Sequence, residues 1–519
     1  MRPSTGEVSA VQSGFAFRSI APYAVLTGFG LLAVLLGQTN SWDLRNYHLY
    51  DGWAFWTGRG DRDFAVAQLQ TYFNPLLATF TYLLYTGLPP WLSTFALGAL
   101  QGANFLPLHA IAKRLLVPAG VTGRDWLPMA AALVGTLGAT QISELGGSMG
   151  DNLVSLPTLC AFAIVLHGPE LGLRRAAFAG LLLGLTTGVK LTVAPFAIGL
   201  VACVLALAWN QRDRWRILAT TAGAAAIGFL VTDGFWMLHL YREFGNPMHP
   251  MYASVFGGDY APPMSMRDDR FVPHKALEWL FYPLVWLTAP HRVSDSWFFD
   301  LRIPLAFLAV PLLIRQRDAA EPRLQRALLL GLAVAYLVWL PLFGIYRYLA
   351  PLEMLAPLLV LLVLERDART AATMLLLAML VCVRPPGWGR LHTYRAAFLE
   401  AEIPALPELD RATIVLAEDE PLAFFALAFP PSAQFVRIGG NLLGPPNAAY
   451  GMDREAARRI ARSDGHIYAL LASPQSDHVR EVLARQHLVL DPPCAPLRAN
   501  LLKRNSSAEL CPLQRRPES

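Results

Sequence analysis

The chain has 519 residues, of which 54% are hydrophobic and only 16% are charged, and its mean hydropathy is +0.37. An average soluble protein is about one quarter charged, so this composition is shifted towards that of membrane proteins and leaves too much apolar surface for a disordered chain. The net charge of +5 is small, and the basic residues stand in short clusters between apolar runs. This pattern is typical of membrane topology signals and not of a nucleic-acid-binding surface, so we predict a multi-spanning membrane protein that binds no nucleic acid.

Apolar stretches predict eleven membrane spans, because a transmembrane helix needs about 20 mostly apolar residues. The first span follows Arg18 and has no small-residue cleavage site, so we expect a retained anchor and not a removed signal peptide. The stretch Pro75–Leu88 is too short for a span and is expected to be interfacial or re-entrant. The predicted spans lie near residues 20–38, 93–112, 126–143, 150–167, 176–189, 191–209, 216–238, 301–314, 324–343, 347–364 and 370–384.

Five clusters of Lys and Arg predict the orientation of these spans. All five fall in cytoplasmic loops when the N-terminus is inside, as the positive-inside rule requires. Two long loops, about 39–92 and 239–300, and the C-terminus then lie on the outer side of the membrane. The clusters are Lys113, Arg114 and Arg124; Arg174 and Arg175; Arg212, Arg214 and Arg216; Arg315, Arg317, Arg323 and Arg326; and Arg366 and Arg369.

The first outer loop mixes aromatic and polar side chains. Wound as an α-helix, it places Trp42, Leu49, Trp53 and Trp56 on one stripe, which is expected at the membrane interface. The opposite stripe presents carboxyl, amide and phenol groups: Asp43, Asn46, Tyr47, Tyr50 and Asp51. A second polar group follows: Gln68, Gln70, Thr71, Tyr72 and Asn74. Such groups are costly beside lipid, so they line a cavity, bind a polar ligand or bond to one another, and these alternatives stay open.

A glycine-rich turn, residues 146–150, lies in a short outer loop between two predicted spans. Glu144 and Asp151 frame this turn. Carboxylates beside a compact turn can complete a substrate cleft, while Asp151 could equally cap the helix that follows it.

Residues 385–519 differ from the rest of the chain, because Arg, Pro and Glu increase and the apolar runs shrink to strand length. We therefore divide the chain into a transmembrane domain, 1–384, and an exported α/β domain, 385–519, with a largely parallel sheet. Its predicted strands are Ala412–Ala417, Gln434–Ile438, His466–Ala472 and His487–Leu490. The predicted helices between them are Asp453–Arg462 and Ser476–Arg485.

The five cysteines fall into two groups. Cys160, Cys203 and Cys382 lie in apolar spans and are expected to be small buried side chains. Cys494 and Cys511 lie 17 residues apart in the exported domain, and we predict a disulfide between them, which requires an oxidising compartment. Two unpaired thiols are the alternative.

Several short motifs across residues 20–384 form a recognisable set. Asp43 lies just beyond the first span, Asn74-Pro75 opens the next apolar stretch, and a glycine-rich helix, 184–192, contains Lys190 near its end. The segment 245–252 contains His249, and Arg347-Tyr348-Leu349 lies at an outer span end. This set resembles the GT-C superfamily, multi-spanning membrane glycosyltransferases that use polyprenyl-phosphate sugars. The chain departs from many relatives at Leu44, where they carry a second carboxylate.

The resemblance implies a GT-C-like fold in a bacterial inner membrane, with the C-terminal domain in the periplasm. It implies inverting transfer of a sugar from a polyprenyl-phosphate donor to a lipid, glycan or protein acceptor, with membrane lipid around the spans. Asp43 is the candidate base, and Lys190 and Arg347 are candidates to neutralise the departing phosphate. The full set of candidate substrate-binding residues is Asn46, Tyr47, Asp51, Gln70, Tyr72, Asn74, Glu144, Asp151, Lys190, His249 and Arg347.

The pattern leaves the metal and the function class open. The chain has no HExxH or CxxC motif, and Mg²⁺ or Mn²⁺ held by Asp43 and a second carboxylate stays an alternative. A transporter or lipid flippase is a second hypothesis, although the polar residues concentrate in the outer loops and no internal repeat is evident. A non-catalytic membrane protein of envelope assembly is a third, and it predicts that Asp43 is dispensable.

Overall fold

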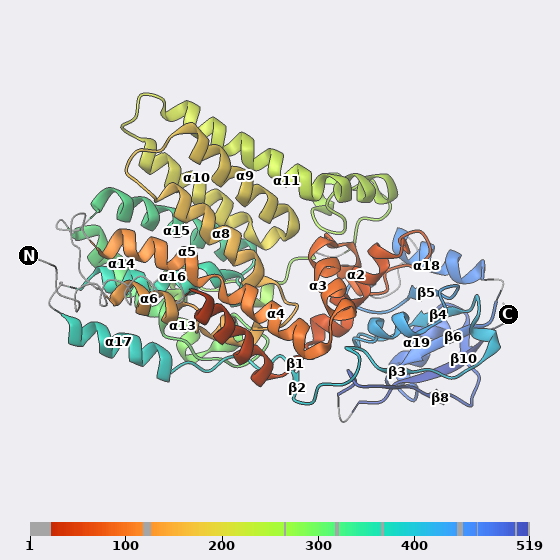
Figure 1. Cartoon of the computed structure of the whole chain (residues 1–519). Coiled ribbons are helices and arrows are strands. Elements are labelled where there is room, and N and C mark those ends of the chain that lie inside the picture. Colours follow the sequence, from red (N-terminus) through yellow and green to blue (C-terminus); the bar gives the residue numbers. More distant parts are fainter. Residues whose placement is uncertain are drawn as a thin grey trace, which may run out of the picture. The chain divides into compact units, whose positions relative to one another are not determined.

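The computed structural model describes residues 22–117, 126–263, 266–316, 321–364, 368–443, 450–463, 465–503 and 506–516. It is mostly helical, at 61%, with a small sheet region (Figure 1). The chain divides into two compact units: 1–38, 91–232 and 268–388 form the first, and 39–90, 233–267 and 389–519 form the second. Four basic residues of the topology prediction lie outside the described residues: Arg18, Arg124, Arg317 and Arg366.

The first unit is built from helices (Figure 1). It begins with the helix Pro22–Leu36. Its further α-helices are α4 (Pro90–Gly102), α5 (Phe105–Leu116), α6 (Leu127–Gly135), α7 (Ala139–Glu144), α8 (Asp151–Val165), α9 (Leu173–Val189), α10 (Ala194–Ala208), the first part of α11 (Arg214–Phe244), α13 (Ala276–Thr288), α14 (Arg302–Arg315), α15 (Pro322–Leu342), α16 (Ala350–Leu362) and α17 (Arg369–Val381). Short 3₁₀ turns join several of them: η3 (Leu191–Val193), η4 (Asp269–Phe271), η5 (Pro290–Arg292) and η6 (Tyr346–Leu349).

Four helices among the described residues are long and apolar enough to cross a membrane: Pro90–Leu116, Leu191–Ala208, Arg214–Phe244 and Pro322–Leu342. This is far fewer than the eleven expected spans. Shorter apolar helices occupy Pro22–Leu36, Leu76–Gly87, Asp151–Val165 and Arg369–Val381. The expected span 126–143 shows why the number differs, since the chain breaks it into α6 and α7. Hydropathy counts apolar residues but does not register where a buried helix ends.

Glycines let helices of the first unit approach closely. A Cβ atom built on Gly184 of α9 would collide with the main chain of Ala225 on α11, and one built on Gly199 of α10 would collide with the carbonyl of Gly331 on α15. Small residues at such contacts are typical of helix packing in membranes, where dispersion forces and not water exclusion hold helices together.

The second unit combines parts of the two segments predicted as outer loops with the C-terminal region. This grouping differs from the sequence-based division at residue 384, because segments 39–90 and 233–267 fall in one compact unit with residues 389–519. The helical elements of this unit are η1 (Leu44–His48, a π-helix), α2 (Leu49–Trp56), η2 (Gln68–Tyr72), α3 (Leu76–Gly87), α12 (Ala253–Phe256), η7 (Pro407–Leu409), η8 (Ala423–Ala428), α18 (Gly451–Ala461) and α19 (Asp477–Arg485). The stretch expected to be interfacial or re-entrant forms α3.

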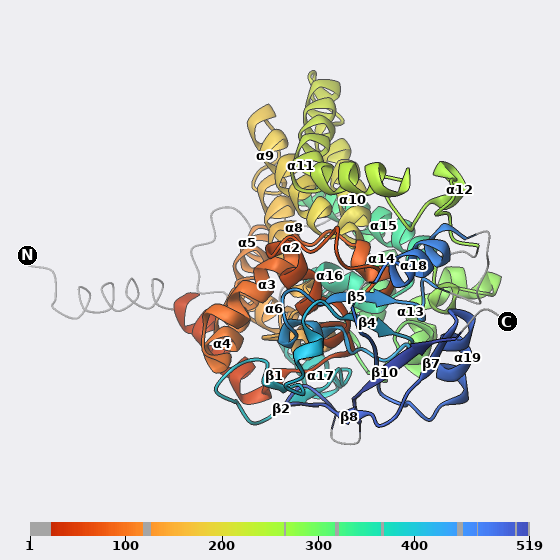
Figure 2. The same cartoon turned by 90° about the vertical axis from the view of Figure 1, so that its right-hand side faces the viewer.

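The central sheet of the second unit has the strand order β5-β4-β6-β10-β7. Figure 2 labels β5, β4, β10 and β7 of this sheet. Strands β4, β5 and β6 are parallel, whereas β10 is antiparallel to both β6 and β7. The strands are β4 (Thr413–Leu416), β5 (Gln434–Arg437), β6 (Ile467–Leu471), β7 (Leu488–Leu490) and β10 (Glu509–Arg515), and short strands lie at β1 (Gln38–Thr39), β2 (Arg390–Leu391), β3 (Ala401–Glu402), β8 (Ala495–Pro496) and β9 (Arg498–Ala499). Strands β4, β5, β6 and β7 and helices α18 and α19 thus begin and end within a residue or two of the expected ranges. Strand β10 was not expected.

Residues of the first outer loop extend this sheet. Phe64 forms a parallel bridge with Val436 of β5, through hydrogen bonds from Phe64 N to Phe435 O at 2.8 Å and from Arg437 N to Phe64 O at 3.0 Å. The Phe64 ring belongs to the hydrophobic core of the sheet, which also includes Phe244 from the end of α11. In strand β10, which lies between β6 and β7, Cys511 is joined to Cys494 by the expected disulfide.

Candidate active site

The glycine-rich turn of the first unit is held in one shape by its neighbours. Gly146 and Gly150 have φ angles of 71° and 87°, a region that L side chains rarely adopt. The side chain of Gln101 accepts a hydrogen bond from Gly146 N at 2.6 Å and donates one to Gly147 O at 3.2 Å. The turn therefore places Met149 and Asp151 at a fixed position where α8 begins.

Lys190, at the end of α9, reaches this turn. Its Nζ donates to the main-chain oxygen of Met149 at 2.8 Å and lies 2.6 Å from Oδ1 of Asp151. The Asp151 side chain is 3% exposed, whereas that of Lys190 is 18% exposed. The Lys190 side chain is therefore anchored at its ammonium group and remains partly exposed.

Arg347, on the η6 turn between α15 and α16, approaches the same carboxylate. Its Nε lies 3.9 Å from Oδ2 of Asp151, and its Nη1 donates to Sδ of Met149 at 3.3 Å. The guanidinium also faces the rings of Tyr348 and Trp388, at 5.3 and 5.9 Å from their centres. Two cations thus share one buried carboxylate, and both keep about a fifth of their side chains exposed.

Glu144 completes the group from the other end of the turn. Its Oε2 accepts a hydrogen bond from Asn152 N at 3.2 Å, so Glu144 and not Asp151 satisfies the start of α8. The alternative in which Asp151 caps that helix is therefore wrong; Asp151 is the first helical residue and pairs with Lys190. Burial, and next the nearby Asp151, raise the pKa of Glu144 well above its usual range, which favours the neutral acid.

The candidate residues of the first outer loop lie in the second unit, and their pattern differs from the expected amphipathic α-helix. Residues Leu44–His48 form a π-helix, whose wider turn shifts every later side chain around the axis. Leu49, expected at the membrane interface, is consequently buried, whereas Trp56 is 62% exposed. Asp43 precedes this turn and is half-buried.

Amide side chains bond to one another behind this helix. Asn46 donates to the main chain of Ala67 at 3.1 Å and to Gln70 Oε1 at 3.4 Å. Gln68 donates to Asn46 Oδ1 at 3.3 Å and accepts from Asn441 N at 2.9 Å. These contacts fit the alternative in which the polar side chains satisfy one another and the loop.

The remaining candidates of the second unit are embedded in packing contacts. The Tyr72 ring lies edge-on to His249, with centres 4.9 Å apart, and burial lowers the pKa of His249 to about 3. Asn74 donates to Asp233 at 2.8 Å. Tyr47 contacts Phe73 edge-on. These contacts hold segments of the unit together; Tyr72 and His249 are buried, whereas Tyr47 and Asn74 are half-buried.

Asp51 differs from them. It is 6% exposed, and its Oδ1 has no hydrogen-bond partner among the residues that the structure describes. Burial raises the pKa of Asp51 well above its usual range. A buried neutral carboxyl suits a structural or proton-donating role better than that of a metal ligand.

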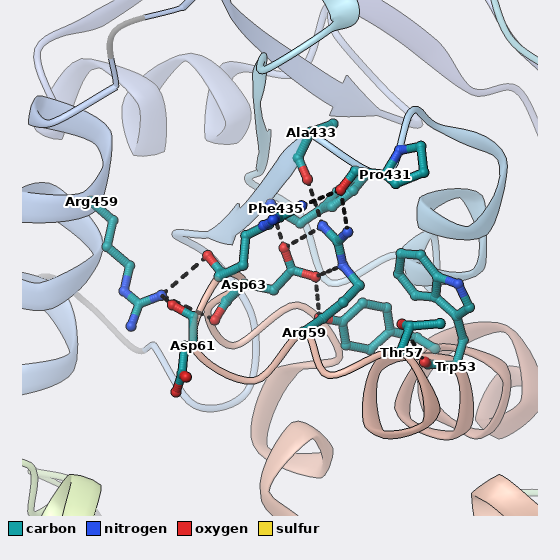
Figure 3. Close-up of polar contacts among 11 residues, drawn as sticks. Trp53, Thr57, Arg59, Asp61, Asp63, Pro431, Ala433, Phe435 and Arg459 are labelled. Carbon is teal, nitrogen blue, oxygen red and sulfur yellow. Dashed lines mark hydrogen bonds and ion pairs between the residues drawn. The ribbon is translucent and has the colours of Figure 1, made fainter.

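Figure 3 shows how the first outer loop is attached to the sheet. Arg59 and Asp63 form a two-point ion pair, at 2.6 and 2.8 Å, with side chains 5% and 3% exposed. Arg59 also donates to the main-chain oxygens of Pro431 and Ala433, and Asp63 accepts from Phe435 N at 3.0 Å. This network fixes the segment that follows α2.

The carboxylates do not fit a divalent cation in this arrangement. Lys190 Nζ lies 2.6 Å and Arg347 Nε lies 3.9 Å from the Asp151 carboxylate, so a divalent cation at that carboxylate would stand beside two positive charges. Within the described part of the chain, the only group of three or more closely placed metal-ligand side chains is Cys494, Glu509 and Cys511, and its cysteines form the disulfide. We therefore derive no chemical step through a metal ion.

The structure thus brings Glu144, Asp151, Lys190 and Arg347 together in the first unit, while the other candidates lie in the second. The sequence analysis missed the part played by the Met149 main chain and by the aromatic rings beside Arg347; a signal for one of these rings was the adjacent Tyr348. No model of a known protein family matches the chain, and no curated protein matches it either.

Proposed function

We propose that the protein is a GT-C-type membrane glycosyltransferase with more spans than the four long apolar helices. It would transfer a sugar from a polyprenyl-phosphate carrier to a lipid, glycan or protein acceptor at the periplasmic face of a bacterial inner membrane. One observation carries the proposal: Lys190 and Arg347, distant in sequence, meet at Asp151 and Met149 with part of each side chain exposed. A lysine and an arginine held in this way can grip the oxygens of a phosphate group.

The reaction requires displacement at the anomeric carbon. The acceptor oxygen or nitrogen forms a bond to that carbon while the bond from the carbon to the phosphate oxygen breaks, and the polyprenyl phosphate leaves with the electron pair. In the first unit, Lys190 and Arg347 would stabilise the negative charge of the leaving phosphate. For the base, the sequence offers Asp43 of the second unit as the candidate to take the proton of the acceptor. Asp151 would orient both cations.

A transporter or flippase gains less support. Such a protein needs polar groups along a path through its helices. The charged side chains buried inside the first unit are already bonded to protein groups: Arg302 donates to Asp300 at 2.7 Å and to the main-chain oxygen of Val134 at 2.9 Å. They are therefore not free to line a path for a substrate. Glu353 accepts from Thr140 N at 3.2 Å. This network ties the break between α6 and α7 to α14 and α16.

The test measures sugar transfer from a panel of polyprenyl-phosphate sugars by the detergent-purified chain, with membrane extract as the acceptor source. We expect Lys190→Gln and Arg347→Gln each to lower the rate about 100- to 1000-fold, as loss of one transition-state charge contact does in other enzymes. Arg174→Gln is the matched control, because Arg174 is exposed near the opposite end of α9. Its transfer rate should equal that of wild type.

Asp43→Asn tests the assignment of the base. A folded Asp43→Asn protein without transfer would support the assignment, whereas wild-type rates would remove Asp43 from catalysis. Unchanged transfer by folded Lys190→Gln and Arg347→Gln proteins would contradict the proposed phosphate site. Absence of transfer by wild type with every donor would favour the transporter or envelope-assembly hypotheses.

A further inference from the structure

Arg45 is a buried cation that the proposed reaction does not use. It lies in the π-helix η1 of the second unit and is 2% exposed. A π-turn is rare and is frequently found at functional sites. The helix packs against η2, α3 and η8, so the Arg45 side chain is enclosed by several elements.

The guanidinium of Arg45 lacks the partners that a buried arginine normally has. Its Nε is buried without a hydrogen-bond partner, and no hydrogen bond from its side chain to any described residue is found. Arg59 in the same unit donates to Asp63, Pro431 and Ala433. Arg437 donates from two of its nitrogens to main-chain oxygens. A buried charge without partners is destabilising, so Arg45 stands apart from the other buried arginines.

The electrostatic surroundings supply only partial compensation. Burial lowers the pKa of Arg45, and the charge of Glu420 acts in the opposite direction. Glu420 is exposed, in the segment between β4 and η8, and it forms no ion pair with Arg45 within 4.0 Å. An arginine keeps its charge in proteins, so this unit holds a positive charge inside it with no contacting anion among the residues that the structure describes.

We infer that Arg45 is the cation of a second oxyanion site, within the second unit, that binds the phosphate group of a substrate. The planar guanidinium can donate two parallel hydrogen bonds to phosphate oxygens. Phosphate compensates a buried guanidinium more fully than a carboxylate does, because it carries up to two negative charges. The inference uses neither Lys190 and Arg347 of the first unit nor Asp43, the residues to which the proposed function assigns roles.

The test follows thermal unfolding of the detergent-purified full chain with inorganic phosphate and, separately, with farnesyl phosphate. Phosphate binding should raise the Tm of wild type by several degrees, and Arg45→Met should remove at least part of that rise. Without ligand, Arg45→Met should unfold at the same Tm as wild type or higher, since the variant removes an uncompensated buried charge. An arginine retained only for stability would give a lower Tm. Arg62→Met, a change of an exposed arginine in the same unit, should keep the full rise.

Two further comparisons make the result decisive. The double variant Lys190→Gln/Arg347→Gln should retain the part of the rise that Arg45→Met loses, and this separates the two sites. A rise with farnesyl phosphate alone assigns a lipid-borne phosphate, and an equal rise with inorganic phosphate assigns a free phosphate. An undiminished rise in Arg45→Met would overturn the inference. If that variant does not fold, Arg45→Lys decides: about tenfold weaker phosphate binding supports the inference, and unchanged binding contradicts it.

Discussion

Glu144 and Asp151 are two buried carboxyl groups at the ends of one short turn, with different surroundings. Asp151 has a lysine within 2.6 Å, whereas Glu144 accepts a main-chain hydrogen bond and has no cation at contact distance among the described residues. Desolvation, and next the charge of Asp151, raise the pKa of Glu144, and the charges of Lys190 and Arg347 oppose this rise only in part. Such a pair gives one site both an anchored anion and a proton donor.

This difference predicts a pH dependence. Because the pKa of Glu144 is higher in the folded chain than in the unfolded one, its contribution to stability is complete below the usual glutamate pKa and is lost as the pH rises towards the folded value. Each pKa unit by which the folded value exceeds the unfolded one corresponds to about 1.4 kcal/mol in the free energy of unfolding. Glu144→Gln mimics the neutral acid and should remove this loss. Its Tm should therefore exceed that of wild type by an amount that grows as the pH is raised from about 5 to about 9.

The measurement is Tm against pH for both proteins in one detergent. Parallel curves would show that Glu144 is ionised in the fold. Sugar transfer by Glu144→Gln separates a structural from a chemical role, because the amide keeps the hydrogen-bond acceptor for Asn152 but supplies no acidic proton.

At the scale of elements, the turn before α8 depends on glycine. A Cβ on Gly146, whose φ is 71°, would lie 2.8 Å from Cβ of Ala33 and 2.8 Å from Cγ2 of Thr94. Gly146→Ala should therefore destabilise the chain by about 1–3 kcal/mol and displace the site. Gly223→Ala on α11 is the control, since a Cβ there meets nothing within 4 Å and alanine favours helices. Thermal unfolding and transfer rates test this; equal loss in both variants would contradict it.

The ion pair between Arg59 and Asp63 predicts a second effect of this kind. Removing one partner of a buried pair leaves the other uncompensated, so Arg59→Met should cost about 3–5 kcal/mol. Arg62→Met changes an exposed neighbour whose side chain donates to the Pro431 oxygen, and it should cost less than about 1 kcal/mol. The protease resistance of residues 389–519 in the intact chain measures this difference between the two variants, because detachment of residues 59–66 exposes β5. Equal protease resistance of the two variants would argue against this role.

The sequence predicted elements well where the pattern is local. Alternation of strand and helix gave β4, β5, β6 and β7 with α18 and α19, because each has its own periodicity. The π-turn at Leu44–His48 was not predictable from a 3.6-residue period, and it moved Leu49 into the interior. Strand β10 contains Pro512 and charged ends, so its pairing is decided by tertiary contacts.

Prediction of the candidate site had the same limits. Lys190, Arg347, Glu144 and Asp151 could be selected by residue type and by position at the ends of apolar stretches. Their meeting at Met149 could not, because a main-chain oxygen leaves no mark in the sequence. Tyr72, Asn74 and His249 were selected for polarity, yet their contacts are mainly with one another and with neighbouring segments.

At the scale of the whole molecule, the second unit is assembled from three separate stretches of chain, so its C-terminal region is incomplete by itself. Phe64 pairs with β5 and is 2% exposed, and the core also receives Phe244. Burial of one phenylalanine contributes about 1.5–3 kcal/mol, and the bridge also covers the edge of β5. We therefore expect residues 389–519, expressed alone in an oxidising compartment, to unfold without a cooperative transition.

The same fragment should gain cooperativity when residues 57–68 are joined to it by a flexible linker, because the added segment restores the Phe64 bridge and the Arg59–Asp63 pair. A linked segment carrying Asp63→Asn and Phe64→Asp is the matched control and should restore nothing. Circular dichroism during heating distinguishes these proteins. A cooperative transition at the same Tm in all three would mean that residues 389–519 fold independently, and that the first outer loop is an addition to a complete domain and not a part of it.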